Sequence, residues 1–403
     1  RSAVFAPLPE PLCIILDEEH EQSYKAGDCP RYHARQVAFW RTRSSGCLVL
    51  GSATPSLETW YHAREGALVP LSLGERISPH PPAALRTVNI ADEPPGAVLS
   101  APLLAGLAAR KEKGEQSILF MNRRGYSTFI FCRDCDGPAR CPHCSISLNL
   151  HTDKNILLCH HCGYKVPWTG TCPTCSGKRI RAAGTGTQRV ESFLAQRLPG
   201  LRQQRLDSDS IAAGANLEEV LARFRRKELD VLLGTQMVGK GLDFPDVTLA
   251  GVVFADSELN LPDFRSYERT FIQLTQVLGR SGRADKPGEG IIQTLQPESD
   301  PIASAVRGDL EGFYGRELER RREHRYPPFC RIIRIVCRSR NEEAARTTAR
   351  TLRELLEPLL PPGGEILGPA PCPLEKISGN YRHHLLLKAP EIRSLLDWVR
   401  AAG

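Results

Sequence analysis

Residues 132–175 read CRDCDGPARCPHCSISLNLHTDKNILLCHHCGYKVPWTGTCPTC, and they hold eight of the chain's fourteen cysteines. The eight form four C-x-x-C pairs: Cys132/Cys135, Cys141/Cys144, Cys159/Cys162 and Cys172/Cys175. A C-x-x-C turn directs two thiolates toward one point, and two such turns supply the four ligands of a tetrahedral zinc ion. A redox motif is normally a single pair, and a disulfide framework is typical of secreted proteins. The stretch therefore predicts two four-cysteine sites holding two Zn²⁺ ions.

The four turns can be paired in two ways. Fourteen residues separate Cys144 from Cys159, and they read as two strand-like runs around a polar turn. A hairpin there would join the inner pairs in one site (Cys141, Cys144, Cys159, Cys162) and leave the outer pairs for the other (Cys132, Cys135, Cys172, Cys175). Sequential pairing is the alternative, but the five residues between Cys135 and Cys141 are few for a zinc ribbon. We favour the nested arrangement, in which the metal ions would supply the folding energy that this polar segment lacks.

The composition of the 403-residue chain is that of an ordinary globular protein with two or three domains. No apolar run approaches the roughly 18 residues of a membrane-spanning helix. No signal peptide is evident, so we expect reduced cysteines and a cytoplasmic protein. The net charge of +7 favours a polyanionic partner only weakly. Because Arg1 leads quickly into a strand-like run, we expect a fragment that begins inside a domain.

Two short apolar runs near the N-terminus end in polar motifs. Residues 12–20 read LCIILDEEH, which predicts a buried parallel strand, and residues 46–56 read GCLVLGSATPS, which predicts a second one. Open α/β sheets bind ligands at the carboxyl ends of their strands. Asp17 is suited to hold Mg²⁺, and Glu18 to orient an attacking water during nucleotide hydrolysis. The alternative is a strand that ends in solvated acids.

Aromatic and basic residues alternate between these two motifs. Residues 22–41 read QSYKAGDCPRYHARQVAFWR. Bases stack on aromatic rings while phosphates pair with basic side chains, so the pattern is suited to single-stranded nucleic acid. The alternative is a loop followed by an amphipathic helix whose aromatics face the core, and we favour that alternative for Phe39 and Trp40.

Changes in composition divide the chain into segments. Proline and polar residues dominate residues 70–102, which indicates a linker. Strand and helix patterns alternate after it, with the cysteine array as an insertion. We expect the C-terminal part of a first α/β lobe over 1–75, a linker over 76–102, the start of a second lobe over 103–131, a zinc-binding insertion over 132–178, the rest of the second lobe over 179–300, and a small α/β domain of β-α-β-β-α order, cut before its last strand, over 301–403.

Two motifs of the second lobe concern phosphate binding. Gly234, Gly239 and Lys240 match G-x-x-x-x-G-K, but Gly241 stands where a P-loop requires Ser or Thr. The following FPDV also prevents the necessary helix, so we reject a P-loop here and find none elsewhere in the chain. A helix over 267–283 ends in QVLGRSGR. Its arginines could neutralise a transferring phosphate, and the alternative is a basic surface turn.

The order of these motifs resembles that of superfamily 2 helicases, in which two RecA-like lobes enclose ATP. With its eight-cysteine insertion, the chain resembles the PriA family of replication restart helicases (primosomal protein N′) over almost its whole length. The matching segments are DEEHEQSYK with RYHARQVA, GSATPSLET, NRRGYS, GTGTQRVE, RLDSDS, FADSELNLPDFRSYER and GPAPCPLEKISGNYRHHLLLK. The fold class implied is α/β, with a partial first RecA-like lobe, a complete second lobe of P-loop-NTPase type that carries the two-zinc insertion, and a small α/β C-terminal domain.

The resemblance implies roles for individual residues. Asp17 and Glu18 would hold Mg²⁺ and the attacking water, and His20 would couple to Gln276. Ser52 and Thr54 would link hydrolysis to DNA movement. The further residues expected at ATP are Gly241, Asp243, Arg280 and Arg283. Those expected at DNA are Tyr24, Lys25, Arg31, Tyr32, Arg123, Arg124, Thr235, Gln236 and Lys240. The nested pairing of the cysteines is also implied.

The function implied is that of an ATP-dependent 3′→5′ DNA helicase of the replication restart primosome. It would recognise stalled forks and D-loops, bind single-stranded DNA-binding protein and other primosome proteins, and promote reloading of the replicative helicase. The family's N-terminal DNA-binding domains and P-loop are absent from this chain, so we expect it not to hydrolyse ATP by itself. Leu242 stands where the family usually has histidine, and Gly239 where it has alanine. The alternative function is a non-catalytic, zinc-dependent DNA-binding scaffold.

Overall fold

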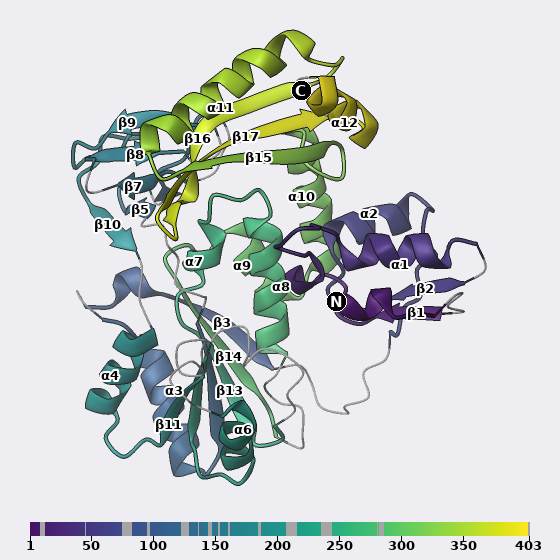
Figure 1. Cartoon of the computed structure of the whole chain (residues 1–403). Coiled ribbons are helices and arrows are strands. Elements are labelled where there is room, and N and C mark those ends of the chain that lie inside the picture. The colour runs from purple at the N-terminus through teal and green to yellow at the C-terminus, as the bar shows by residue number, and fades with distance from the viewer. Residues whose placement is uncertain are drawn as a thin grey trace. The chain divides into compact units, whose positions relative to one another are not determined.

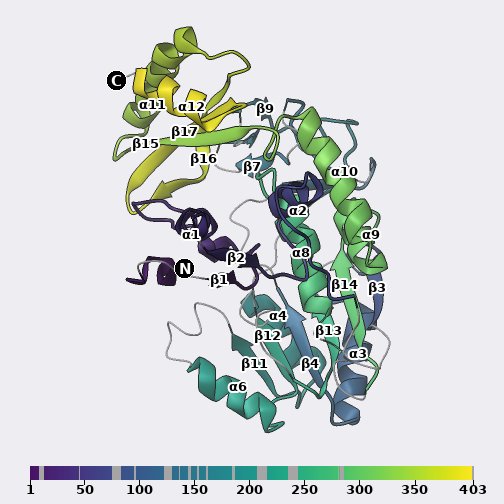
Figure 2. The same cartoon turned by 90° about the vertical axis from the view of Figure 1, so that its right-hand side faces the viewer.

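The computed structural model describes residues 1–8, 13–44, 46–74, 83–94, 97–121, 129–135, 137–143, 147–151, 154–159, 162–183, 187–206, 216–234, 244–279, 281 and 286–401. The chain divides into two compact units, unit 1 over 1–74 and unit 2 over 75–403, each of which is described by itself. Their elements are labelled in Figures 1 and 2. Among the described residues, no helix is long and apolar enough to span a membrane.

Unit 1 is built on a parallel strand pair. Its elements are η1 (Ser2–Phe5), β1 (Cys13–Leu16), η2 (Gln22–Tyr24), α1 (Ala34–Thr42), β2 (Cys47–Leu50) and α2 (Leu57–Arg64). The two predicted strands form and are parallel, but the predicted burial is wrong. Leu16 packs against α1, whereas Ile15 is 68% exposed and Val49 39% exposed. One face of the strand pair is therefore open in this unit.

Helix α1 lies on β1 through its small residues. Ala34 and Ala38 are fully buried against Leu16. Positions four apart share one face of a helix, and Phe39 and Trp40 lie off that face. They are 55% and 61% exposed, so the expectation that these aromatics face the core is wrong.

Unit 2 contains a six-stranded parallel sheet in the order β11-β12-β4-β13-β14-β3. The strands are β3 (Ala84–Asn89), β4 (Gln116–Phe120), β11 (Gln203–Leu206), β12 (Val231–Gly234), β13 (Val247–Val252) and β14 (Glu289–Thr294). The accompanying helices are η3 (Ile90–Asp92), α3 (Ala101–Glu112), α4 (Thr187–Arg197), α6 (Leu217–Arg225), α7 (Asp256–Leu259) and α8 (Ser266–Leu278). Figure 1 shows the sheet as the lower part of unit 2.

Helices cover both faces of this sheet because successive residues of a strand point to opposite sides. Leu119 and Leu233 pack with α3 and α4, while Ile118 and Leu232 pack with α6. At Gly290 on β14, an added methyl group would lie 2.6 Å from Leu278 of α8. Helix α8 therefore approaches the sheet more closely there than a larger residue would allow.

The structure differs from the predicted linker over 76–102. Residues 84–89 of that range form β3, the edge strand of the large sheet, which pairs in parallel with β14. Ser100 then caps α3 by accepting a hydrogen bond from the N–H of Leu103. Prolines near β3 suggested a linker, but an edge strand tolerates such neighbours because only one of its sides is paired.

The Cys-rich insertion, defined here as residues 129–183, leaves and re-enters the lobe through adjacent strands. Its strands are β5 (Phe129–Cys132), β6 (Gly137–Pro138), β7 (Asn149–His151), β8 (Ile156–Leu158), β9 (Lys165–Pro167) and β10 (Ile180–Ala183). β5 and β10 pair antiparallel, and β7 and β8 form the hairpin predicted between the inner cysteine pairs.

The C-terminal region follows the predicted β-α-β-β-α order. Its elements are α9 (Asp300–Arg307), α10 (Leu310–Glu323), β15 (Arg331–Ser339), α11 (Glu342–Leu356), η4 (Glu357–Leu359), β16 (Glu365–Ile377), β17 (Asn380–Ala389) and α12 (Ile392–Ala401). The antiparallel sheet has the order β15-β17-β16. Leu385 and Leu387 face Leu395 and Trp398 in its core, so α12 packs on the sheet.

Candidate functional site

Two sequence motifs meet where the strands of the parallel pair in unit 1 end: the acidic motif, residues 17–20, and the hydroxyl motif, which contains Ser52 and Thr54. His20 Nδ1 lies 2.7 Å from Ser52 Oγ. Ser52 Oγ also accepts a hydrogen bond from the N–H of Thr54 at 3.0 Å. The structure thus brings together predicted residues that lie more than thirty positions apart, because β1 and β2 end side by side.

The two predicted catalytic acids are accessible. Asp17 is exposed, and the Glu18 side chain is 41% exposed. Glu18 has a φ of 47°, in the left-handed region that residues with a Cβ rarely adopt, and Asp17 Oδ1 accepts its N–H at 3.0 Å. Such backbone conformations gather at functional sites. Both carboxylates could hold a divalent cation or a water from this edge.

Thr54 is fully buried, and its hydroxyl has no hydrogen-bond partner among the described residues. Buried hydroxyls are nearly always paired in folded proteins. Its main-chain N–H instead fixes Ser52, so the predicted coupling pair is held together by Thr54's backbone rather than by its side chain.

The predicted DNA-binding residues of unit 1 lie in the loop 24–33. Tyr24 donates its hydroxyl to the Asp17 carbonyl at 2.7 Å, and burial together with the nearby Asp17 carboxylate raises the Tyr24 pKa. Lys25 Nζ donates to the Arg31 carbonyl at 2.9 Å, and Tyr32 packs edge-on against Phe5. These contacts order the loop beside the acidic segment, while Lys25 and Arg31 remain exposed.

Glu19 is a buried residue of this site that the sequence analysis missed. Its Oε2 accepts from Arg35 at 2.6 Å, and its Oε1 accepts the N–H of Ser56 at 2.5 Å. Arg35 also donates to Ser56 Oγ and to the hydroxyl of Thr59. The carboxylate therefore joins the acidic segment to the first turns of both α1 and α2. Its only signal in the sequence is an extra acid in DEEH.

Gln276 lies partly buried on α8 in unit 2. The remaining predicted site residues fall outside the described residues: Arg123, Arg124, Cys144, Thr235, Gln236, Lys240, Gly241, Asp243, Arg280 and Arg283.

The described thiols of the Cys-rich insertion form two clusters in the nested arrangement. The sulfurs of the outer pairs, Cys132, Cys135, Cys172 and Cys175, all lie within 4.8 Å of one another. Those of Cys141, Cys159 and Cys162 form the second cluster. The closest contacts across the outer cluster are 3.7 Å (Cys132–Cys175) and 3.8 Å (Cys135–Cys172).

These spacings fit a tetrahedral zinc ion. With Zn–S bonds of about 2.3 Å, ligand sulfurs lie about 3.8 Å apart, whereas a disulfide needs about 2.05 Å. Burial raises the pKa of Cys172, but the N–H groups of Cys175 and Thr174 oppose it and bring that pKa down to about 7. Burial raises the pKa of the neighbouring Cys135 thiol, so metal binding would have to displace its proton. A site of thiolates without an open position is a structural site, which would stabilise the fold rather than catalyse.

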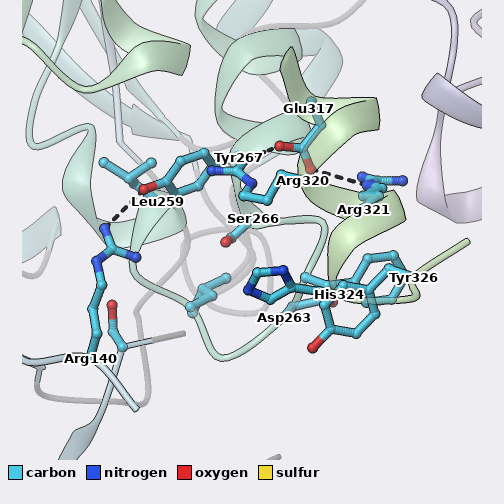
Figure 3. A pocket seen from close by; sticks show the side chains of 13 residues that line it. Arg140, Leu259, Asp263, Ser266, Tyr267, Glu317, Arg320, Arg321, His324 and Tyr326 are labelled. Carbon is cyan, nitrogen blue, oxygen red and sulfur yellow. Dashed lines mark hydrogen bonds and ion pairs between the residues drawn. The ribbon is translucent and has the colours of Figure 1, made fainter. Parts of the chain in front are cut away.

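Aromatic and charged side chains join the insertion to the lobe. Arg140 donates to the Tyr267 hydroxyl at 2.9 Å, and the guanidinium of Arg320 on α10 lies over that ring, 3.8 Å from its centroid. Figure 3 shows Tyr267 between these two arginines, with Glu317 beside Arg321. The pocket between them is lined by residues of the insertion, of α8 and of α10.

Arg321 forms a buried ion cluster behind this pocket. Its Nε donates to Glu317 at 3.0 Å, and its Nη2 donates to Glu268 of α8 at 2.6 Å. Helix α8, which carries Gln276 at its C-terminal end, is therefore fixed at its N-terminal end to α10 by charge pairing. Glu317 lies one helical turn before Arg321, a spacing at which side chains of a helix meet, but Glu268 lies 53 residues from Arg321 and could not be identified from the sequence.

Comparison with known proteins gives the family. The sequence is 43% identical to the replication restart protein PriA of Bacillus subtilis over 96% of this chain and 49% of that protein. It is 40% identical to the PriA of Treponema pallidum over 100% of this chain and 62% of that protein. The chain belongs to the PriA family. It spans about half the length of the curated relatives that it matches.

Family domains match along unit 2 and agree with this assignment. A PriA DNA helicase Cys-rich region domain matches residues 141–167, a helicase conserved C-terminal domain matches 175–285, and a primosomal protein N C-terminal domain matches 322–403. A solved structure with similarity is Saccharomyces cerevisiae Dbp5 bound to RNA and ADP BeF3, at 14% identity, a TM-score of 0.36, and coverage of 75% of this chain and 57% of that chain. The assignment to the family rests on the sequence relatives.

Proposed function

We propose that this chain is part of an ATP-dependent DNA helicase that acts in replication restart. The observation that carries the proposal is the cluster of Asp17, Glu18, His20 and Ser52 at one strand edge, in contact with the loop 24–33 through Tyr24. Exposed carboxylates would bind Mg²⁺–ATP, and an attached aromatic and basic loop would sense single-stranded DNA. Arg280 and Arg283 would neutralise the γ-phosphate, with Gly241 and Asp243 nearby.

The PriA relatives support a fuller proposal for the whole protein. It would unwind DNA in the 3′→5′ direction at stalled forks and D-loops, and it would act with single-stranded DNA-binding protein and other primosome proteins to reload the replicative helicase. In the second lobe, Arg123, Arg124, Thr235, Gln236 and Lys240 would contact DNA. The cytoplasm would be the site of action.

The Cys-rich insertion would hold two zinc ions, with Cys144 as the fourth ligand of the inner site. We expect two zinc ions per chain by elemental analysis, and one after Cys159→Ser, because the outer cluster has its own four thiols. Weaker binding to forked DNA should accompany that loss. Zero or one zinc in the unsubstituted chain would contradict the proposal.

The catalytic proposal is tested in the full-length protein. Glu18→Gln should reduce DNA-stimulated ATP hydrolysis by about 10²-fold or more while leaving binding to forked DNA intact, because the side chain would act on water rather than on DNA. Glu65→Gln, at an exposed position after α2, is the matched control. Fork binding without any ATP hydrolysis in the unsubstituted protein would instead favour the non-catalytic scaffold. The 403-residue chain alone should not hydrolyse ATP, because it contains no P-loop.

A further inference from the structure

The loop 24–33 is a closed structure with a fixed base. The N–H of Ala26 donates to the Tyr32 carbonyl at 2.8 Å, and Lys25 and His33 form an antiparallel β-bridge. Because these contacts join the two ends of the loop, a displacement of the residues between them would also displace the residues on either side, Tyr24 and Ala34–Arg35.

Both flanks of this base are attached to the acidic segment. On the N-terminal side, Tyr24 holds the Asp17 carbonyl. On the C-terminal side, Arg35 in the first turn of α1 holds the Glu19 carboxylate. The two attachments lie on either side of Glu18, whose left-handed backbone the surrounding contacts must maintain. Movement of the loop would therefore act directly on the position of Glu18.

Glu19 also controls the hydroxyl motif. Its second carboxylate oxygen accepts the N–H of Ser56, the N-cap residue of α2, which lies two residues after Thr54. The Glu19 side chain is 0% exposed, and that of Arg35 is 25% exposed. Water screens such a pair poorly, so the two side chains are held together more strongly than a surface pair would be.

We infer that Glu19 is the positioning residue that couples DNA binding at the loop 24–33 to the geometry of the nucleotide site. The inference rests on the proposed function and deepens it. The Glu19 carboxylate accepts hydrogen bonds from Arg35, which follows the loop, and from the N–H of Ser56, which follows the hydroxyl motif. Glu19 is also linked to the catalytic acids directly, because it follows Glu18 in the chain. Because its side chain is 0% exposed, Glu19 acts by making these three segments move together rather than by contact with ATP or DNA.

The test uses the full-length protein with the variants Glu19→Gln, Arg35→Met and the double variant, and with Glu65→Gln as the control. Steady-state ATP hydrolysis is measured without DNA and with a saturating single-stranded oligothymidylate, and DNA affinity is measured by fluorescence anisotropy. Glu19→Gln preserves the shape of the side chain but removes its charge. We expect the DNA stimulation, measured as the ratio of the DNA-stimulated kcat to the DNA-free rate, to fall about tenfold, while the Kd for DNA changes by less than about twofold.

Three results would overturn the inference. One is undiminished stimulation in Glu19→Gln. Another is an equal loss of the DNA-free and DNA-stimulated rates, which would indicate a general structural role. The third comes from the double variant, which leaves neither charge buried alone and whose fold is checked by thermal denaturation: retained stimulation there would show that the pair does not couple the segments. Full-length protein without any DNA-stimulated hydrolysis would overturn the proposed function itself, and with it this inference.

Discussion

Arg321 is almost completely buried, yet its guanidinium group is positively charged. Glu268 and Glu317 surround the guanidinium, and the Pro327 carbonyl accepts a further hydrogen bond at 3.2 Å. The cluster therefore depends on having every member present, because removing one partner of a buried pair leaves an uncompensated charge.

Arg321→Leu should lower the free energy of unfolding of unit 2 by about 3–5 kcal/mol, since it leaves the carboxylates of Glu268 and Glu317 in the protein interior. The measurement is urea denaturation of the chain. Arg316→Leu on the same helix is the control, because its ion pair with Asp300 is partly exposed and should contribute less than about 1 kcal/mol. Similar decreases in the free energy of unfolding for the two variants would show that the buried ion cluster stabilises unit 2 no more than the partly exposed pair does.

His33 makes the stability of unit 1 depend on pH. Burial, assisted by the positive charges of Arg35 and Lys25, lowers the His33 pKa from 6.5 to about 4. The unfolded chain therefore binds a proton that the folded chain does not, and stability should fall as the pH drops from about 6.5 to about 4. After allowance for partial exposure, the loss is on the order of 1–2 kcal/mol.

Urea denaturation at pH 7 and pH 5 measures this loss. Since His33 Nδ1 accepts the N–H of Arg35 at the start of α1, His33→Asn keeps an acceptor there without the titration. The variant should show a smaller difference between the two pH values. A difference equal to that of the unsubstituted chain would assign the pH dependence to other groups.

The sequence indicates candidate site residues where residue type and spacing restrict the chemistry. The structure brings the described thiols of the cysteine pairs together, whereas the catalytic role of the acids after β1 stays a prediction. Glu19 could not be recognised, because Arg35 and Ser56 reach it only after β1 and β2 pair and place their flanking helices beside it. At such positions the residue types in a sequence motif do not distinguish a catalytic acid from a buried structural one.

Among the elements, errors arose where tertiary context decides exposure. The strand pattern predicted β1 correctly but not the exposure of Ile15, which depends on whether another layer covers the pair. The proline-rich stretch concealed β3 in the same way. By contrast, the hairpin of the insertion was predicted because the cysteine spacing restricts its geometry.

Within unit 2, a C-x-x-C turn of the insertion also lies against the C-terminal sheet. Gly163, directly after Cys162, has a φ of 83°, and an added Cβ would lie 2.9 Å from the Pro369 carbonyl of β16. Beside it, Lys154 pairs with Glu375 at 3.1 Å. This contact ties the inner cysteine cluster to β16.

Gly163→Ala should loosen this contact without removing zinc, because no ligand changes. Hydrogen exchange in residues 365–377 should become faster, while the zinc content stays the same. Gly170→Ala is the control: Gly170 has a similar φ of 79°, but a Cβ added there would meet no described atom within 4 Å. Equal effects of the two substitutions would attribute the change to backbone strain rather than to contact with β16.

At the scale of the whole molecule, the two units differ in how much core they contain. Among the described residues, the hydrophobic cluster of unit 1 has four buried members, Leu16 included, whereas unit 2 has cores on both faces of its large sheet. Small domains bury a smaller fraction of their surface and are correspondingly less stable.

We therefore expect unit 1 to unfold at a lower urea concentration than unit 2. Hydrogen exchange followed by mass spectrometry separates the two, since peptides from residues 13–64 report on one unit and those from 101–120 and 231–252 on the other. A single transition shared by all of these peptides would contradict the division into independently stable units.

The antiparallel pairing of β5 with β10 has a consequence for how such a protein can change over time. Cys132 lies opposite Ile180, so the segment between them enters and leaves through two adjacent strands, of which β5 also pairs with β6 and β7 inside the segment. A short turn joining these two positions would delete the segment without moving the strands of the lobe. A segment that begins and ends on adjacent strands could be gained or lost during evolution while the lobe keeps its fold. By the same reasoning, a metal-binding segment from another protein could be inserted at this position.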